Sequence, residues 1–185
     1  NLNTLTEGGI EWGFNEVDAY KAQIYIYPSK ESFDKVKLDI MYLGPAWDDW
    51  SNDENSIYAA LTGLTLRPDD IDVTGDISGA SMLDEEFTNI NMMIKYYKFG
   101  FGRTTDTCNE RIRAGVLTKE CAIDLVDRYD GVCADSIILR YCNYVGISVS
   151  EFWDIINEYT NHNLFYIDKG KRPRKKFIVG IDFVN

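Results

Sequence analysis

Four polar residues flank a turn that contains two glycines, and their side chains are suited to binding an anion: Lys98, Arg103, Thr105 and Asp106. A helix is predicted to begin after this turn, and free N–H groups at a helix N-terminus attract negative charge. Arg103 adds a planar fork of donors that matches phosphate or carboxylate. The four residues are therefore candidates for substrate binding. In the structural alternative, the glycines only form a turn, Asp106 caps the helix and Arg103 pairs with a nearby acid.

Two carboxylates, Glu7 and Glu11, lie in a glycine-rich segment near the start of the chain. Carboxylates in such a loop can bind Mg²⁺, position ammonia or accept hydrogen bonds from sugar hydroxyls. We therefore take Glu7 and Glu11 as the candidate catalytic residues. The alternative is a solvated acidic loop that takes part in no chemistry.

A further candidate group, Trp47 and Asp48, places an aromatic ring beside a carboxylate. This is the composition of many sugar-binding subsites, so both residues are candidates for substrate binding. In the alternative, the tryptophan fills a core and Asp49 or Asp53 caps a helix.

Charge is distributed unevenly along the 185-residue chain. Its net charge of −11 argues against a general nucleic-acid binder. Residues 169–176, with the sequence KGKRPRKK, carry six Lys or Arg and no acid, which leaves 13 basic and 30 acidic residues elsewhere. Such a run is either a solvated loop or a contact for a phosphate or an acidic partner.

The cysteine spacing does not predict a metal site. Cys108, Cys121, Cys133 and Cys142 form no Cys-x-x-Cys pair, and His162 is the only histidine, so zinc ligation is not expected. Four free thiols indicate a reducing compartment, the cytoplasm. The chain has no run of 18 apolar residues, so no membrane span is predicted.

Helical periodicity dominates from residue 84 onward. The first helix is predicted to end at Gly100, and a capping box of Thr107 and Glu110 predicts that the next helix begins there and ends before Gly115. Three later segments repeat apolar residues at i, i+3, i+4 and i+7, which is typical of amphipathic helices. Together these helices predict a small helical lobe.

The last amphipathic helix has the clearest boundaries. Ser148 is predicted to cap it, and its apolar face of Phe152, Ile155 and Ile156 is predicted to be buried. Beyond the basic run, residues 177–183 predict one additional strand.

The first 83 residues alternate short apolar segments with polar loops. Strands are predicted over residues 22–27 and 37–44, and a helix is predicted between them, with Ser29 and Ser32 as alternative N-caps. A second helix is predicted between Asp53 and Gly63.

Several segments, taken in order, match the motifs of one family. Between Lys98 and Gly131 the chain contains Lys-Phe-Gly-Phe-Gly-Arg, then Thr-Asp, Ile-Arg-x-Gly and Tyr-Asp-Gly. The segments Tyr25–Asp53 and Gly146–Phe165 match more loosely. On these residues the chain resembles the bacterial N-acetyl sugar amidotransferases of the N-type ATP-pyrophosphatase group, over roughly residues 5–166.

The resemblance implies a reaction. In this family ATP adenylates the acetamido oxygen of a nucleotide-linked N-acetyl sugar, and ammonia from a glutaminase partner then displaces AMP. The product carries an acetamidino group and enters lipopolysaccharide O-antigen or a related surface glycan. The resemblance thus implies ATP and Mg²⁺ as cofactors, a sugar nucleotide as substrate and a glutaminase subunit as partner.

The chain departs from the family at two places. Cys121 stands where the family has Glu, which removes half of a capping box at Thr118 and weakens a helix start by ~1 kcal/mol. More importantly, the chain contains no Ser-Gly-Gly-x-Asp-Ser loop, which the family uses to hold the phosphates of ATP. We therefore expect these 185 residues to be the carboxy-terminal part of such an enzyme and to be inactive alone.

The sequence predicts an α+β fold. Residues 1–83 would end a Rossmann-like nucleotide domain, residues 84–166 would form the helical lobe, and residues 167–185 would form a basic tail with a strand. Two other functions stay open: a lobe that docks the glutaminase without a site of its own, and a pyrophosphatase that acts on another acceptor. Association into a homo-oligomer also stays open.

Overall fold

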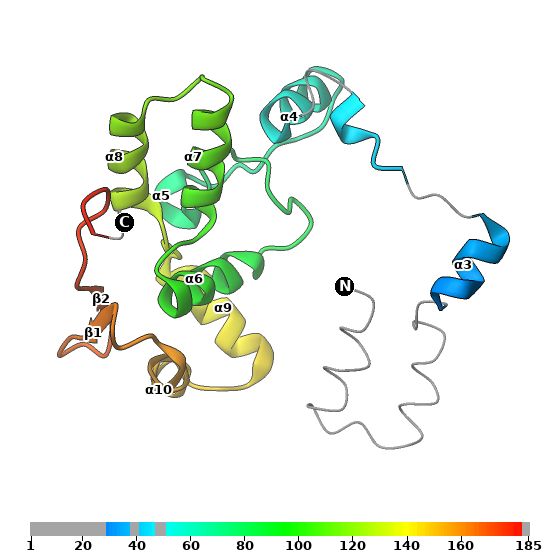
Figure 1. Cartoon of the computed structure of the whole chain (residues 1–185). Coiled ribbons are helices and arrows are strands. Elements are labelled where there is room, and N and C mark those ends of the chain that lie inside the picture. Colours follow the sequence, from blue (N-terminus) through cyan, green and yellow to red (C-terminus); the bar gives the residue numbers. More distant parts are fainter. Residues whose placement is uncertain (1–28, 38–40, 47–50, 183–185) are drawn as a thin grey trace. The chain divides into compact units, whose positions relative to one another are not determined.

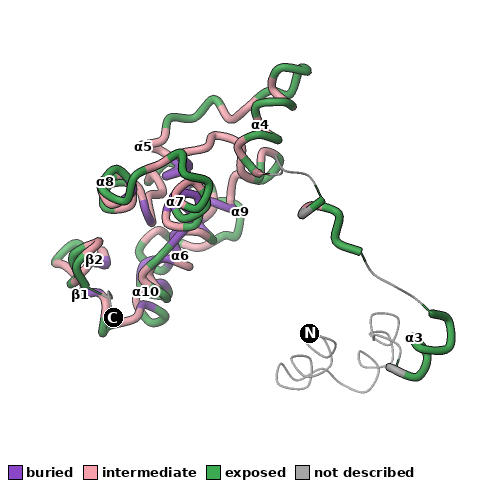
Figure 2. Tube along the Cα trace, turned by 45° about the horizontal axis from the view of Figure 1, so that its top comes forward, coloured by how far each residue is buried: buried purple, intermediate pink, exposed green. Residues whose placement is uncertain are grey.

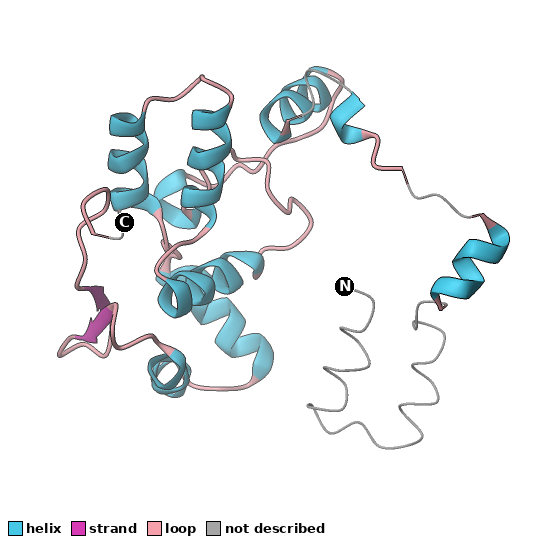
Figure 3. Ribbon diagram, viewed as in Figure 1, coloured by secondary structure: helices cyan, strands magenta, loops and turns pink. Residues whose placement is uncertain are grey.

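The computed structural model describes residues 29–37, 41–46 and 51–182. The chain divides into two units, Asn1–Trp50 and Ser51–Asn185. Helices make up nearly all of the described secondary structure, with one small pair of strands (Figure 3). The boundaries predicted at residues 83 and 166 stay predictions.

In the first unit, the described residues form helix α3 (Lys30–Val36) and the 3₁₀ helix η2 (Gly44–Ala46). The Ser29 hydroxyl accepts a hydrogen bond from the N–H of Ser32, so of the two predicted alternatives Ser29 is the N-cap and Ser32 lies within the helix.

Of the two strands predicted in this unit, neither is found among the described residues. Met41, Tyr42 and Leu43 are exposed and lie in no strand, so the buried strand predicted over 37–44 is wrong for these residues. A strand is stable only when a neighbouring strand pairs with it, and the described residues of this unit include none. The strand predicted over 22–27 lies outside the described residues.

The second unit begins with α4 and ends beyond a two-stranded sheet. Its helices are α4 (Asn52–Leu61), α5 (Ile71–Thr74), α6 (Thr88–Phe99), α7 (Arg103–Arg113), α8 (Lys119–Tyr129), α9 (Asp135–Val145) and α10 (Val149–Tyr159), and its strands are β1 (Phe165–Ile167) and β2 (Pro173–Lys175). Helices α7 and α8 lie side by side (Figure 1). Helix α4 agrees with the helix predicted between Asp53 and Gly63.

Helices α6, α9 and α10 pack against one another and hold the hydrophobic core. The purple segments of Figure 2, which mark buried residues, gather on this part of the second unit. The core residues are Ile90, Met93, Ile137, Ile138, Cys142, Phe152, Trp153 and Ile156. The apolar spacing of the sequence therefore found the correct helices, although it did not find every buried position.

The buried face of α10 was predicted with one error. Phe152 and Ile156 are 3% and 7% exposed, whereas Ile155 is 43% exposed, so its predicted burial is wrong. Ile155 lies at the edge of the apolar stripe, one position from Ile156, and it lines a small cleft beside α6 instead.

We expect Phe152→Ala to lower the free energy of unfolding by about 3 kcal/mol, because it removes a buried ring and leaves a cavity. Ile155→Ala on the same helix is the matched control and should cost less than about 1 kcal/mol. Urea unfolding followed by circular dichroism measures both values. Equal losses in the two variants would contradict the packing described here.

The boundary between α6 and α7 lies at two glycines. Gly100 adopts a left-handed conformation at the end of α6, with φ of 81°, which confirms its prediction. Helix α7 starts at Arg103 after Gly102, so the predicted start at Thr107 is wrong, and Thr107 is a buried residue within the helix. The sequence missed this start because Gly102 has no side chain to cap the helix, and the cap comes from a distant residue.

The basic run forms a β-hairpin with the segment before it. Strands β1 and β2 pair antiparallel, with Phe165 opposite Lys175 and Tyr166 opposite Arg174. Residues 177–182 form turns, so the strand predicted over 177–183 is wrong for its described part. The second unit is thus mostly helical with a two-stranded sheet, which agrees with an α+β class. A Rossmann-like domain stays a prediction.

No helix in the described part of the chain is both long enough and apolar enough to cross a membrane.

Candidate functional site

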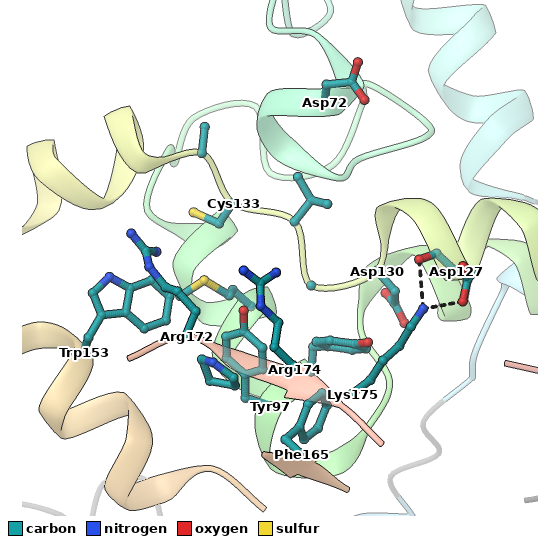
Figure 4. A pocket seen from close by; sticks show the side chains of 16 residues that line it. Asp72, Tyr97, Asp127, Asp130, Cys133, Trp153, Phe165, Arg172, Arg174 and Lys175 are labelled. Carbon is teal, nitrogen blue, oxygen red and sulfur yellow. Dashed lines mark hydrogen bonds and ion pairs between the residues drawn. The ribbon is translucent and has the colours of Figure 1, made fainter. Parts of the chain in front are cut away.

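A cavity of about 420 Å³ lies between the hairpin, helices α6, α8 and α10, and the segment that joins α8 to α9 (Figure 4). Its wall combines cations, carboxylates and aromatic rings. The lining residues that have such side chains are Asp72, Tyr96, Tyr97, Asp127, Asp130, Trp153, Phe165, Arg172, Arg174 and Lys175. This volume lies within the range of small-molecule sites in proteins.

Three cations of the basic run reach the cavity wall, and each one pairs with a carboxylate. Arg172 Nη2 lies 2.9 Å from Asp135 Oδ1. Lys175 Nζ pairs with Asp127, as the dashed lines in Figure 4 show. The hairpin is therefore tied to α9 and to α8 by ion pairs at the edge of the cavity.

Arg174 pairs within its own hairpin. Its Nε donates to Asp168 Oδ2 at 2.8 Å, and Asp168 also accepts from the backbone N–H groups of Gly170 and Arg172. These hydrogen bonds and the Arg174 guanidinium lower the pKa of Asp168. Asp168 therefore fixes the turn that brings the basic residues to the cavity.

Aromatic side chains form the deeper part of the wall. The Arg172 guanidinium lies 3.9 Å from the ring centroid of Trp153, a cation–π contact that orients both groups. Trp153 is 4% exposed, and its ring N–H has no hydrogen-bond partner among the described residues. A buried donor without a partner is costly in a folded protein, so this part of the wall has an unused hydrogen-bond donor.

Tyr97 lies beside the same cations. Burial raises the pKa of its hydroxyl to about 12, although the nearby Arg172 and Arg174 oppose the shift. Because the folded chain holds this proton more tightly than the unfolded chain does, the contribution of Tyr97 to stability is fully present below the unfolded pKa of about 10. That contribution is lost as the pH rises from about 10 through about 12.

We therefore expect the free energy of unfolding to decrease less between pH 10 and pH 12 in Tyr97→Phe than in the unchanged protein, by up to about 2 kcal/mol. Urea unfolding at a series of pH values measures this slope. Tyr144→Phe is the control, because the Tyr144 ring is 78% exposed and changes its surroundings little on unfolding. A slope that Tyr97→Phe leaves unchanged would contradict the burial of this hydroxyl.

Asp130 connects the cavity to the start of α7. Its carboxylate accepts from the N–H of Gly102 at 2.8 Å, from the N–H of Thr104 at 3.0 Å and from the hydroxyl of Thr105 at 2.6 Å. Burial raises the pKa of Asp130, and these donors partly lower it. The free N–H groups that the sequence predicts as an anion site are thus bound to a carboxylate of the protein itself. This occupancy was not foreseen.

The residue after Asp130 is Gly131, and its backbone lies very close to the ring of Tyr96. Gly131 has φ of 77°, and a Cβ atom added there would lie 2.1 Å from Tyr96 Cδ1. Only glycine fits this conformation and this close approach.

Arg103 is buried at the start of α7. It is 8% exposed, its Nη1 donates to Asn89 Oδ1 at 3.2 Å, and the same atom lies 3.7 Å from Asp76 Oδ2. Burial lowers the pKa of Arg103, and the charge of Asp76 opposes this. The structural alternative, in which Arg103 pairs with an acid, is therefore confirmed.

The remaining predicted residues are spread over different places. Thr105 bonds Asp130, Asp106 pairs with Lys95, and Lys98 lies 5.7 Å from the ring centroid of Phe99. The structure thus places Arg103, Thr105 and Asp106 in the first turn of α7, whereas Lys98 lies near the end of α6.

Four predicted site residues lie outside the described part of the chain: Glu7, Glu11, Trp47 and Asp48. A substrate-binding or catalytic role for any of the predicted residues stays a prediction.

The thiols and the metal-ligating side chains add no further site. All four cysteines are free, and burial raises the pKa of Cys133, which lines the cavity, to about 12. Its thiol is therefore not an active nucleophile near neutral pH. Among the described residues, no three His, Cys, Asp or Glu side chains are grouped as metal ligands would be.

Sequence reasoning missed Tyr97, Trp153 and Asp127 as parts of a site. Helical spacing marks Tyr97 only as part of an apolar face and does not include Trp153, and it does not separate a core position from a cavity wall. The signal that pointed here was the basic run, whose contact with a phosphate or an acidic partner was left open.

Residues 83–178, just over half of the chain, match the family described as LPS biosynthesis protein WbpG-like, C-terminal domain. The matched range contains α6 to α10 and both strands, and it includes every lining residue of the cavity except Asp72. No curated protein matches the chain.

Proposed function

Because the chain belongs to the WbpG-like family of lipopolysaccharide (LPS) biosynthesis proteins, we propose that it is the carboxy-terminal part of an ATP-dependent N-acetyl sugar amidotransferase. Its substrate is a nucleotide-linked N-acetyl sugar, and its nitrogen comes from a glutaminase subunit. The product serves the synthesis of lipopolysaccharide. Because ATP and nucleotide-linked sugars are made in the cytoplasm, the proposed reaction belongs there.

The proposed reaction proceeds in two steps. The acetamido oxygen attacks the α-phosphorus of ATP, which forms an O-adenylate and releases pyrophosphate. Ammonia then adds to the activated carbon, and AMP leaves with the oxygen, so that the sugar carries an acetamidino group. Both steps need a site that holds the sugar and excludes water.

The observation that supports a substrate-facing role is the composition of the cavity. Its wall places Arg172, Arg174 and Lys175 next to Trp153 and Tyr97, and nearly all of it falls in the family-matched range. Small-molecule sites combine aromatic walls with a few polar groups in this way. A lobe that only docks another subunit would need no such cavity, which is why we favour the enzyme over the docking alternative.

The described residues do not fit ATP and Mg²⁺. The chain contains no Ser-Gly-Gly-x-Asp-Ser loop, and the described residues contain no group of acidic side chains that could hold a metal. We therefore assign no contact with ATP to this chain, and we propose that another part of the enzyme binds it.

The test uses the full-length protein with ATP, Mg²⁺ and UDP-N-acetylglucosamine as a model sugar nucleotide. With ammonium as nitrogen source, AMP and pyrophosphate should form in equal amounts, and mass spectrometry should show the acetamido oxygen replaced by nitrogen. The 185 residues alone should form neither AMP nor pyrophosphate. AMP formation that is independent of any sugar would reject the proposal, and so would pyrophosphate release by the 185 residues alone.

Comparing glutamine with free ammonium as the nitrogen source distinguishes the proposed enzyme from a lobe that only docks the glutaminase. If the lobe only docks the glutaminase, changes at the cavity wall should abolish turnover with glutamine and leave turnover with free ammonium intact. If the cavity holds the substrate, both nitrogen sources should be affected equally.

A further inference from the structure

The six cations of the basic run fall into two sets of three. Arg172, Arg174 and Lys175 line the cavity, whereas the other three do not: Lys169, Lys171 and Lys176. Lys171 pairs with Asp154 on α10, and Lys176 donates to the carbonyl of His162. The hairpin thus directs half of its positive charge to one cavity.

The two arginines at the wall retain unused donors. Arg172 uses Nη2 for Asp135, and Arg174 uses Nε for Asp168. Their other guanidinium N–H groups have no hydrogen-bond partner among the described residues. Figure 4 shows both guanidinium groups on the side of the cavity where Cys133 lies. Two forks of free donors that face one space suit an anion with several oxygens, such as phosphate, better than a single carboxylate.

The residues just before α9 lie at the same wall. The N-cap residue of α9 is Ala134, which has no side-chain acceptor, and Ala134 and Cys133 both line the cavity. Helix α9 has no side-chain hydrogen bond at its N-cap, and its first turn contains the acidic residue Asp135. The buried N–H of Trp153, which lacks a partner, belongs to the same wall.

We propose that Arg172, Arg174 and Lys175 bind the diphosphate of a ligand in this cavity. This deepens the proposed function, because a nucleotide-linked sugar carries a diphosphate, and in that respect it rests on the proposed function. The arginines hold phosphate oxygens through their free N–H groups. Lys175 adds a charge after it exchanges its Asp127 partner for the ligand.

The carboxylate of Asp127 competes with the ligand in this arrangement. The cavity wall carries three cations and three carboxylates, Asp72, Asp127 and Asp130, so its charges balance and it has no excess of positive charge. Asp127→Asn removes the competing charge and should tighten diphosphate binding about threefold, by the scale of an exposed ion pair. A purely structural ion pair would give no gain.

The experiment measures binding by isothermal titration calorimetry to the full chain, with UDP, inorganic pyrophosphate and uridine as probes. UDP and pyrophosphate should bind, and uridine should not. Arg172→Gln and Arg174→Gln should each weaken UDP binding about tenfold or more, the scale of a charge-assisted hydrogen bond. Lys169→Gln and Lys176→Gln change the net charge equally and are the matched controls, and they should change binding by less than about twofold.

Several outcomes would overturn the proposal: equal weakening in all four variants, UDP binding that the arginine variants do not change, or uridine binding as tightly as UDP. Arg172→Lys keeps the charge but loses the fork, and it should bind at least about threefold more weakly than the wild type. Circular dichroism confirms that each variant is folded. If the chain bound diphosphate but formed no AMP in response to a sugar, the proposed function alone would be rejected. If Arg172→Gln and Arg174→Gln left turnover unchanged, this inference alone would be rejected.

Discussion

Asp130→Ala is expected to lower the free energy of unfolding by about 4 kcal/mol. The substitution removes one carboxylate that accepts hydrogen bonds from Gly102, Thr104 and Thr105. The N–H groups of Gly102 and Thr104 would then lie buried without an acceptor, and each unsatisfied group costs about 1–3 kcal/mol. The loss of the N-cap of α7 is part of the same cost. Chemical unfolding followed by circular dichroism measures the change.

Asp106→Ala is the matched control for Asp130→Ala. Asp106 lies in the first turn of α7, but its side chain is 51% exposed and pairs only with Lys95. Its loss should cost less than about 1 kcal/mol. Asp130→Asn should be intermediate, because its carbonyl oxygen still accepts but its amide group faces N–H donors. If Asp130→Ala lowered the free energy of unfolding as little as Asp106→Ala, the hydrogen bonds of Asp130 would not stabilise the start of α7.

The second large effect is expected at Arg103. Arg103→Ala should lower the free energy of unfolding by about 3–4 kcal/mol, because it leaves Asp76 as a buried carboxylate without its cation. Asp76 is 4% exposed, so water cannot readily replace the lost partner. The measurement is again chemical unfolding, made at neutral pH.

Arg113→Ala on the same helix is the control for Arg103→Ala, because Arg113 is exposed and should contribute less than about 0.5 kcal/mol. The double variant Arg103→Met with Asp76→Leu should regain part of the loss, since it removes both buried charges together. If Arg103→Ala and Arg113→Ala lowered the free energy of unfolding by similar amounts, the ion pair between Arg103 and Asp76 would not stabilise the fold.

The helical part of the fold was largely readable from the sequence. The i, i+3, i+4 spacing predicts α8, α9 and α10, and Ser148 caps α10 as expected, since its hydroxyl accepts from the N–H of Glu151. The spacing works here because each helix buries one face against its neighbours. Thr118 likewise still caps α8, although Cys121 follows it where a glutamate would complete the capping box.

The errors have a shared physical cause, which is that long-range partners are not visible in local sequence. Helix α7 starts at a glycine because Asp130 caps it from another helix end, and local capping rules therefore placed its start too late. The segment from Phe165 to Lys175 was not predicted as a hairpin, because its strands are three residues long and Pro173 breaks the usual alternation.

The site was predictable only in part. The basic run was recognised as a possible phosphate contact, but no rule divides its six cations into those that face the cavity and those that do not. That division depends on the pairing of Tyr166 with Arg174 and of Phe165 with Lys175. The burial of Arg103 depends on Asp76, which lies 27 positions earlier in the segment that joins α5 to α6.

The cap of α7 also constrains the order in which this lobe can form. Gly102 and Thr104 depend on an acceptor that follows them by 28 and 26 residues. During synthesis, α7 leaves the ribosome before Asp130 does, so its first turn has no acceptor until α8 is complete. The first turn of α7 and the end of α8 should therefore form one cooperative unit, in which the amides of Gly102, Thr104 and Asp130 exchange with deuterium at a common rate.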